Sequence, residues 1–416
     1  MSGARTQTEQ RVARIVLVGT LDTKGHEYAY LRERIREAGA DVTLIDAGVL
    51  GEPQVPADIS REEVARAAGA DHAELARDAD RGHAVEVMGR GAREVLSRLY
   101  AAGELQGAAA VGGSGNTSIA AEAMRELPVG VPKLIVSTVA SGDTRPYVGA
   151  KDVTMMYSVV DIAGINQISG QILTNAAGAI VGMAAAHAGV SDKGKPLVGA
   201  TMFGVTTESV TCARERLEEL GYEVLVFHAT GTGGQSFEVL AGEGFLVGAL
   251  DITTTELADE LVGGVLSAGP ERLEAAGRAG IPQVVSLGAL DMVNFGPADT
   301  VPERFAERNL YVHNPTVTLM RTTAAENAEL GRRIGEKLNR AASPTVLFVP
   351  LGGVSAIDVE GQPFHDPDAD AALFDALRKA IDPATVEVHE LDANVNDPGF
   401  ATAMADRLHE LIEAAR

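Results

Sequence analysis

The sequence predicts an α/β protein with two Rossmann-like domains, each a mostly parallel sheet covered by helices. Short apolar runs alternate with amphipathic stretches along the chain, which is the βαβ order that builds parallel sheets. Aromatic residues make up 4% of the chain and tryptophan is absent, whereas glycine occurs 46 times. Small aliphatic cores between many tight turns are typical of strands covered on both faces. The length of 416 residues is too great for one ordinary core and suits two domains.

The first half of the chain alternates strands and helices. Its expected strands are the apolar runs RIVLVG (14–19), DVTLIDAG (41–48), AAAVGG (108–113) and PKLIVST (132–138). Helical periodicity predicts helices over 26–40 and 81–102, which lie between these strands. Ser60 and Glu63 have the spacing of a capping box, which predicts another helix that runs to Ala68.

The second half repeats this alternation after a polar connector at 191–196. Its expected strands are LVGATMFG (197–204), YEVLVFHA (222–229), PQVVSLG (282–288), TVLFVPLGG (345–353) and VEVHEL (386–391). The helix from Glu208 to Gly221 ends on a glycine, a common C-terminal signal. We therefore expect three parts: a flexible tail at 1–13, a nucleotide-binding Rossmann-like domain at 14–192, and a second α/β domain at 193–416.

The charge of the chain limits its partners. Its formal net charge is −23, so it repels nucleic-acid backbones and anionic lipid surfaces. We expect neither nucleic acid nor membrane among its partners, although backbone N–H groups can still bind a small anion. Cys212 is the sole cysteine, which excludes an intramolecular disulfide and a multi-cysteine metal site. No signal-like segment opens the chain, so we expect a cytoplasmic protein, and we assign no residue to a metal site.

One uncharged stretch is long enough to cross a bilayer. No Asp, Glu, Lys or Arg occurs between Ile162 and Ser191. The stretch nevertheless contains several amides, among them Gln167, Gln171 and Asn175, which a lipid-facing helix would not carry. We expect buried helices of small residues, packed inside the protein or at a subunit interface.

The ends of the first four strands supply the candidate ligand-binding residues. In open parallel sheets, ligands bind beyond the carboxyl ends of the strands, so residues that follow the strands gather at one edge. The candidates at this edge are Thr20, Asp22, Thr23, Lys24, Asp46, Gly112, Gly113, Ser114, Gly115, Asn116, Thr117, Ser137, Thr138, Ser141 and Asp143.

The segment GGSGNT (112–117) has the composition of an anion cradle. Glycines let the backbone approach a ligand closely, and the N-terminus of the following helix presents unpaired N–H groups. Ser114 and Thr117 add hydroxyl donors. The segment lacks the lysine of a Walker A loop and the spacing of GxGxxG. The alternative is a glycine turn that only lets the strand and helix pack tightly.

Three charged residues near the cradle have two possible roles each. Lys24 could meet a phosphate, and Asp22 could hold a ribose hydroxyl or Mg²⁺; the alternative for both is a surface ion pair. Asp46 follows the second strand, where dinucleotide-binding folds place the acid that binds ribose. The alternative for Asp46 is a cap of a helix or turn.

The second half offers candidates for chemistry on a polar small molecule. His228 or His313 could move a proton, and Arg321 could clamp a carboxylate. His228 also opens HATGTGGQSFE (228–238), another segment with the shape of an anion cradle. The alternatives are a hydrogen-bonded structural histidine and an Arg321 that pairs with Glu326. No HExxH or GxSxG motif is present, which disfavours a metalloprotease or an α/β-hydrolase.

Several longer segments together resemble one known family. GTLDTKGHEYAYLRERIREAGADVTLIDAG, DRGHAVEVMGRGA, GGSGNT, HATGTGGQSFE and HNPTVTLMRTT are similar to the family named after the tomato mosaic virus resistance protein, as is the long run from Pro132 to Asn166. The resemblance implies two α/β domains, ATP bound by the first of them, and dimers. The family pattern often reads GGSGGT; Asn116 tolerates a left-handed backbone best among non-glycine residues, so the loop shape is expected to survive.

Three functions remain open at this point. The first is an ATP-binding homodimer, with phosphate on GGSGNT and with Mg²⁺ as an optional companion of ATP. The second is an enzyme that transfers a phosphoryl or adenylyl group from ATP to a small carboxylate or sugar acid, with His228 and Arg321 as catalytic residues. The third is a non-catalytic regulatory or interaction module that responds to ATP.

Overall fold

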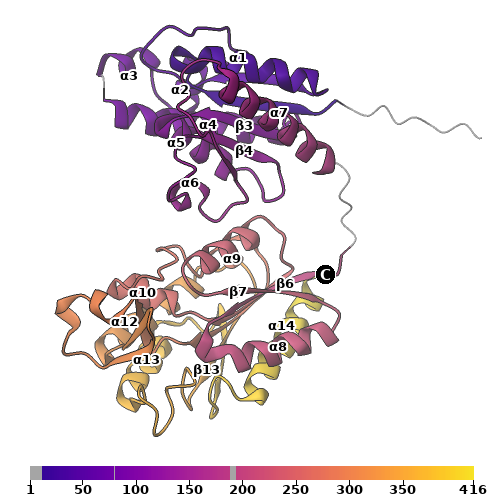
Figure 1. Cartoon of the computed structure of the whole chain (residues 1–416). Helices are drawn as coiled ribbons and strands as arrows, with labels where there is room; N and C mark the ends of the chain where they lie inside the picture. Colours follow the sequence, from indigo (N-terminus) through magenta and orange to yellow (C-terminus); the bar gives the residue numbers. More distant parts are fainter. Residues whose placement is uncertain (1–11, 79, 188–193) are drawn as a thin grey trace, which may run out of the picture. The chain divides into compact units, whose positions relative to one another are not determined.

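The chain folds into two compact units, Met1–Asp192 and Lys193–Arg416 (Figure 1). The structure, a computed structural model, describes residues 12–78, 80–187 and 194–416. Most of the tail expected at 1–13 and the first part of the connector at 191–196 lie outside the described residues. Each unit contains a parallel sheet covered by helices, so the predicted fold class is confirmed.

The first unit contains a five-stranded sheet in the order β2-β1-β3-β4-β5, and all of its pairs are parallel. Its strands are β1 (Arg14–Gly19), β2 (Asp41–Asp46), β3 (Gly107–Gly112), β4 (Lys133–Ser137) and β5 (Thr154–Tyr157). The order reverses between β1 and β3, which places the topological switch point there. The sequence did not predict β5, because this four-residue edge strand is half-exposed and has no apolar run.

The helices of the first unit cover both faces of this sheet. They are α1 (Leu21–Glu37), α2 (Arg61–Ala67), α3 (His72–Asp78), α4 (Arg81–Ala101), α5 (Ser114–Arg125), α6 (Arg145–Val148) and α7 (Gln167–His187). Successive residues of β1 point to opposite faces. Ile15 and Leu17 pack with α1 and α7, whereas Val16 and Val18 pack with α2, α4 and α5.

Helix α7 contains most of the uncharged stretch. Among the described residues it is the one helix long and apolar enough to cross a membrane by length and composition, and 39% of its most apolar window is buried. Leu173, Ala176 and Ile180 face the sheet and join its core. The expected packing of small residues against the protein interior therefore accounts for one side of α7.

The second unit contains a six-stranded parallel sheet in the order β14-β13-β9-β8-β6-β7. Its strands are β6 (Leu197–Met202), β7 (Glu223–His228), β8 (Gly248–Thr253), β9 (Gln283–Gly288), β13 (Thr345–Pro350) and β14 (Val386–Leu391). The sequence predicted all of these except β8. Asp251 interrupts the apolar run of β8; it is buried, and its carboxylate accepts hydrogen bonds from Arg272 and Thr201.

A small antiparallel sheet accompanies the large one. Its strands β10 (Met292–Phe295), β11 (Leu310–Asn314) and β12 (Val317–Arg321) pair in the order β10-β12-β11. The segments 288–296 and 313–323 therefore contain strands that the apolar runs of the sequence did not predict. The helices of the unit are α8 (Thr207–Glu219), α9 (Thr232–Gly242), α10 (Glu256–Val262), α11 (Ala275–Ala279), α12 (Ala324–Leu338), α13 (Pro367–Ala380) and α14 (Pro398–Ala415), with short 3₁₀ turns at Gly204–Thr206, Ala298–Thr300 and Glu303–Phe305.

Candidate functional site

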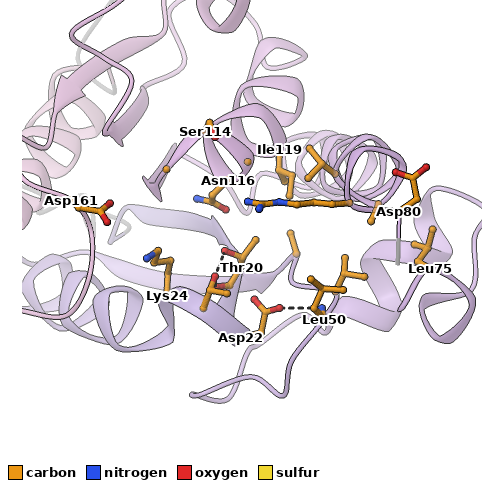
Figure 2. A pocket seen from close by; sticks show the side chains of 18 residues that line it. Thr20, Asp22, Lys24, Leu50, Leu75, Asp80, Ser114, Asn116, Ile119 and Asp161 are labelled. Carbon is orange, nitrogen blue, oxygen red and sulfur yellow. Dashed lines mark hydrogen bonds between the residues drawn. The ribbon is translucent and has the colours of Figure 1, made fainter. Parts of the chain in front are cut away.

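A pocket of about 400 Å³ lies in the first unit, where strands β1, β2 and β3 end (Figure 2). Eight of the residues predicted from the strand ends line it: Thr20, Asp22, Thr23, Lys24, Gly113, Ser114, Gly115 and Asn116. Ten further lining residues were not predicted: Ala47, Val49, Leu50, Leu75, Asp80, Arg81, Ala84, Val85, Ile119 and Asp161. The strand-end rule thus found one side of the pocket.

Most of the GTLDTKG segment (19–25) is helical, whereas the helix predicted from the sequence begins only at residue 26. Helix α1 begins at Leu21, and its regular geometry is interrupted at Lys24, whose φ is −128°. The carboxylate of Asp46 accepts hydrogen bonds from the N–H groups of Leu21, at 3.1 Å, and Gly48, at 2.9 Å. Asp46 is 2% exposed and does not line the pocket, so it caps a helix and a turn, as in the alternative reading. Burial raises the pKa of Asp46, and the nearby Asp22 carboxylate adds to this rise.

Asp22 lies on the pocket wall and holds the neighbouring turn. Its Oδ2 accepts a hydrogen bond of 3.1 Å from the N–H group of Leu50 (Figure 2) and one of 3.2 Å from that of Gly51. Its Oδ1 is buried and has no hydrogen-bond partner within the described residues. Asp22 therefore positions the turn after β2, which supplies Val49 and Leu50 to the pocket.

Lys24 is engaged with the segment that follows β5. Its ammonium group donates a hydrogen bond to the carbonyl oxygen of Ile162. One turn further along α1, the buried carboxylate of Glu27 accepts a hydrogen bond of 2.7 Å from the N–H group of Gly164. These two contacts hold the segment against α1 and bring Asp161, which precedes Ile162, to the pocket wall.

The GGSGNT segment forms the N-terminus of α5. The helix begins at Ser114, and Gly113 precedes it in an extended conformation with a φ of −82° and no side-chain cap. The N–H groups of Ser114, Gly115 and Asn116 donate to no acceptor within the described residues. The first turn of α5 therefore offers unused donors beside the pocket.

The three glycines of this segment differ in what the fold requires of them. A Cβ atom at Gly112 would lie 2.6 Å from the Cβ of Asn116, so Gly112 is needed for packing. A Cβ atom at Gly113 would lie no closer than 3.8 Å to its nearest neighbour, Thr138 Oγ1, and one at Gly115 no closer than 3.5 Å to Arg81 Nη2. Neither residue has a positive φ. The packing alternative explains Gly112, and the N-cap position of α5 suits a glycine at Gly113, but neither reason applies to Gly115.

Asn116 has a fixed orientation inside α5. Its Nδ2 donates to the carbonyl oxygen of Val111, at 2.9 Å, and to Tyr28 Oη, at 2.8 Å. A carbonyl oxygen can only accept, so the amide nitrogen must face Val111. The remaining Oδ1 is buried and has no partner within the described residues. Asn116 is helical, so the expectation of a left-handed backbone is wrong. The hydrogen bonds of its Nδ2 account for the asparagine instead.

The five predicted residues between Thr117 and Asp143 do not line the pocket. The hydroxyl groups of Thr117 and Ser137 are 2.7 Å apart and fully buried, so they join α5 to β4. Asp143 is exposed and forms an ion pair of 2.7 Å with Arg145, whose hydrogen bonds lower the pKa of Asp143 to about 2. Thr138 and Ser141 also lie outside the pocket lining.

The unpredicted wall of the pocket is mostly apolar and comes from α3, α4 and α5. Leu75, Ala84, Val85 and Ile119 face Val49 and Leu50 from the turn after β2. Asp80 caps α4 by accepting a hydrogen bond of 3.1 Å from the N–H group of His83, which puts Arg81 at the first helical position. The spacing Arg81, Ala84, Val85 marks one face of a helix and was the available sequence signal for this wall.

The second glycine-rich cradle is occupied by the chain itself. Glu256 Oε1 accepts hydrogen bonds from the N–H groups of Gly231, at 2.7 Å, and Gly234, at 3.0 Å. Arg272 donates to Glu256 Oε2 at 2.7 Å and also binds Asp251. The N-terminus of α9 therefore already holds a carboxylate, and the expected anion-binding role of 228–238 is not available to a ligand.

The two predicted catalytic residues of the second unit have contrasting surroundings. His228 is exposed at the end of the edge strand β7, with its ring 5.6 Å from that of Phe203. Arg321 is buried, and it donates to Asp370 at 2.7 Å, to Asp358 at 3.3 Å and to the carbonyl oxygen of Phe364 at 2.7 Å. With these donors in use, Arg321 does not fit the expected role of a carboxylate clamp.

Other polar residues of the second unit, among them the candidate His313, belong to buried networks or to a hairpin. Glu326 pairs with Arg308, at 2.7 Å, and not with Arg321 as the alternative expected. Ser355 donates to Asp291 at 2.8 Å, and burial raises the pKa of Asp291 to about 6. Burial and neighbouring carboxylates raise the pKa of Asp358 to about 9. His313 is exposed on the β11–β12 hairpin. No group of three or more His, Cys, Asp or Glu residues that could hold a metal occurs within the described ranges.

Comparison with protein-family models gives one match for each unit. Residues 13–189 match the model described as "Uncharacterised protein family (UPF0261) N-terminal domain". Residues 195–412 match the model of the C-terminal domain of the same family. Together the two matches cover almost the whole described chain.

Individual relatives agree with these matches. A UPF0261 protein of Clostridium tetani is 55% identical over 400 residues, which are 96% of this chain and 99% of that protein. The ToMV resistance protein Tm-1(GCR237) of Solanum lycopersicum is 40% identical over 97% of this chain, which aligns with 56% of the tomato protein. The solved structure of the Streptomyces sp. SF2575 glycosyltransferase SsfS6, complexed with thymidine diphosphate, covers 97% of this chain and 96% of its own at 10% identity. Its TM-score of 0.19 is too low to support an inference.

Proposed function

Because this chain belongs to the uncharacterised protein family UPF0261, a membership that leaves its activity open, we propose its function from the geometry of the first unit: the binding of ATP in the pocket at the ends of β1, β2 and β3. The proposed ligand lies with its phosphates on the first turn of α5 and its base against the apolar wall. The cytoplasm is the proposed compartment, and a homodimer is the proposed working form.

The observation that supports this proposal best is the space above Gly113 and Gly115. Glycine inside a helix costs about 0.5–1 kcal/mol relative to alanine, a cost that applies to Gly115, whereas Gly113 is the N-cap of α5, where glycine is tolerated well. Neither position needs glycine for a positive φ or for packing against a neighbour. A side chain at either position would project beside the unused N–H groups of α5, where a phosphate oxygen would otherwise lie.

The composition of the walls supports a nucleotide over a free anion. A pocket of about 400 Å³ has room for much more than a phosphate group. Val49, Leu75 and Ile119 offer an apolar surface for a flat base. Asp22 lines the pocket, and its carboxylate could accept a hydrogen bond from a ribose hydroxyl or contact Mg²⁺. Because no protein cage for a metal occurs in the described ranges, Mg²⁺ would be held mainly by the phosphates.

Isothermal titration of ATP with Mg²⁺ into the wild-type protein, Gly113→Val and Gly399→Val tests the proposal. A Cβ atom at Gly399 of α14 would meet no atom within 4 Å, so this variant adds the same side chain outside the pocket. We expect wild-type binding, no measurable binding by Gly113→Val, and wild-type affinity for Gly399→Val. Equal affinity in all three proteins would contradict the proposed position, and no binding in the wild type would contradict ATP as the ligand.

A specific observation favours the regulatory alternative over an ATP-dependent transferase. Of the groups expected to bind a second substrate, Arg321 is bound to Asp358 and Asp370, and the N–H groups of Gly231 and Gly234 are bound to Glu256. A non-catalytic module that responds to ATP needs neither group. Measurement of ADP release, with and without small carboxylates and sugar acids, would separate the two functions. Measurement of molar mass with and without ATP would test whether ATP changes the dimer.

A further inference from the structure

If ATP binds in this pocket, as proposed above, its phosphate groups need a cationic side chain nearby. Two cationic side chains line the pocket, Lys24 and Arg81. We propose that Arg81, and not Lys24, binds the phosphate groups and that it makes the pocket selective for phosphorylated ligands. The sequence pointed to Lys24 because it follows β1, whereas Arg81 is separated in the sequence from both β2 and β3.

Lys24 already has a structural partner. Its ammonium group donates to the carbonyl oxygen of Ile162, and this contact lies beside the one between Glu27 and Gly164. A lysine that turned toward a phosphate would leave the Ile162 carbonyl without this donor and would loosen the segment that carries Asp161. Lys24 is therefore a positioning residue, which affects every ligand of the pocket to a similar degree.

Arg81 has no such commitment. It is exposed, and within the described residues it forms no ion pair and donates no hydrogen bond. The carboxylate of Asp80, the preceding residue, accepts the hydrogen bond that caps α4. The neighbouring arginines on either side in the chain, Arg77 and Arg90, both have glutamate partners.

The position of Arg81 brings its charge to the first turn of α5. Its Nη2 lies 3.5 Å from the point that a Cβ atom of Gly115 would occupy. That point is next to the N–H groups of Ser114, Gly115 and Asn116, which donate to no acceptor within the described residues. The absence of a side chain at Gly115 leaves room for both sets of donors to reach the same oxygen atoms. A guanidinium group offers two parallel N–H donors, which match two oxygens of one phosphate.

A second observation indicates that this end of the pocket is built for a ligand. Asn116 is 6% exposed, and its Oδ1 has no hydrogen-bond partner within the described residues. The contacts of its Nδ2 with Val111 and Tyr28 fix the amide, so Oδ1 cannot turn away to find one. Figure 2 shows the Asn116 side chain pointing toward the space between Ser114 and Thr20. A buried acceptor without a donor is costly, and because phosphate oxygens only accept, the donor for Asn116 Oδ1 would be a hydroxyl group of the same ligand.

Two arginine variants of the same helix test the proposal. Arg81→Gln removes the charge from the pocket, and Arg90→Gln removes an equal charge from α4 at a position outside the pocket lining. Each protein is titrated with ATP, and with adenosine in competition with ATP. We expect Arg81→Gln to weaken ATP binding by roughly 10- to 100-fold, the loss typical of a hydrogen-bonded charge pair. Its affinity for adenosine should change less than about twofold, and Arg90→Gln should bind both ligands as the wild type does.

The other outcomes overturn the proposal and are distinguishable from failure of the proposed function. Wild-type ATP affinity in Arg81→Gln would show that Arg81 does not contact the phosphates, while ATP binding itself would stand. Equal losses for ATP and adenosine would assign Arg81 to the base or to the fold. A wild-type protein that binds neither ligand would remove the proposed function first. Lys24→Gln completes the set, because the proposal expects it to weaken ATP and adenosine by similar factors.

Discussion

Position 116 requires an asparagine because its side-chain NH₂ group donates to two acceptors, the Val111 carbonyl oxygen and Tyr28 Oη. Val111 is a strand residue whose carbonyl oxygen faces α5, and Tyr28 reaches the same point from α1. The amide thus links a strand and two helices inside the first unit. An aspartate in its place would set a carboxylate oxygen against the Val111 carbonyl oxygen, with no proton between them.

We expect Asn116→Asp to lower the free energy of unfolding of the first unit by about 2–4 kcal/mol, because two buried hydrogen bonds are lost together. Asn314→Asp is the matched control. Asn314 is exposed and only accepts, from the N–H and hydroxyl groups of Thr316, and an aspartate can accept in the same way. Thermal unfolding of both variants checks the prediction, and equal melting temperatures would contradict it.

Asp259 makes the stability of the second unit dependent on pH. Burial raises its pKa to about 7, although Asn294 and Leu266 donate hydrogen bonds to it. In the unfolded chain an aspartate titrates near pH 4, so the folded state binds the proton more tightly. The favourable contribution is complete below about pH 4 and is lost as the pH rises toward 7.

Asp259→Asn should remove this dependence. Asn294 Oδ1 has no partner within the described residues, so the Asn294 amide can rotate and accept from the new side-chain NH₂ group. Between pH 4.5 and 8, the stability of the variant should rise relative to that of the wild type, by at most about 4 kcal/mol. Melting temperatures measured across this range check the sign. A difference that stays constant with pH would contradict the prediction.

At the scale of the elements, a glycine in the first turn of helix α5 lowers the stability of the helix and leaves its N-terminus open. Gly115 lies inside the helix and has space for a Cβ atom, whereas Gly112 at the end of β3 does not. The two positions look alike in the sequence and differ in the structure, because only the neighbour across the turn distinguishes them.

Gly115→Ala should therefore stabilise the first unit by about 0.5–1 kcal/mol while it weakens ATP binding. Gly112→Ala should destabilise the unit, since its Cβ atom would lie 2.6 Å from that of Asn116. Thermal unfolding and ATP titration of the same two variants check both halves of the prediction. A Gly115→Ala protein that is more stable and binds ATP normally would show that the first turn of α5 is not the phosphate site.

Helix α9 differs from α5 because the Glu256 carboxylate occupies its N-terminus. Glu256→Ala would leave the N–H groups of Gly231 and Gly234 and one side of Arg272 without their partner. Removing one member of a buried ion pair typically costs about 3–5 kcal/mol. Glu271→Ala, which breaks a surface pair with Arg278, should cost less than about 1 kcal/mol. Similar melting temperatures for the two variants would contradict this assignment.

The sequence predicted elements better than side-chain directions. Apolar runs predicted four strands of the first unit and five of the second, and they missed β5 and β8 because one is exposed and the other contains Asp251. The strand-end rule brought Gly113 and Asp22 to one pocket. It could not tell that Asp46, in the right place, turns inward to cap Leu21. The wall from α3 and α4 was missed because helical periodicity marks an apolar face without saying which part of it lines a cavity.

At the scale of the whole molecule, the two units have separate cores and separate sheets. Each of the residues that line the pocket belongs to the first unit, Met1–Asp192. The fragment 1–192 should therefore fold alone and bind ATP within about twofold of the affinity of the full chain. Titration of the fragment and of the full chain under the same conditions checks this. A much weaker fragment would mean that the second unit contributes to the site.

The carboxylate of Glu256 has one further consequence. A group attached to the same chain is present at an effective concentration that a freely diffusing metabolite rarely reaches. Glu256 therefore occupies the N-terminus of α9 whenever the unit is folded, and the occupancy does not depend on the concentration of any free anion. The N-terminus of α5 has no tethered occupant among the described residues. Of these two helix N-termini, it alone can respond to the concentration of a free ligand.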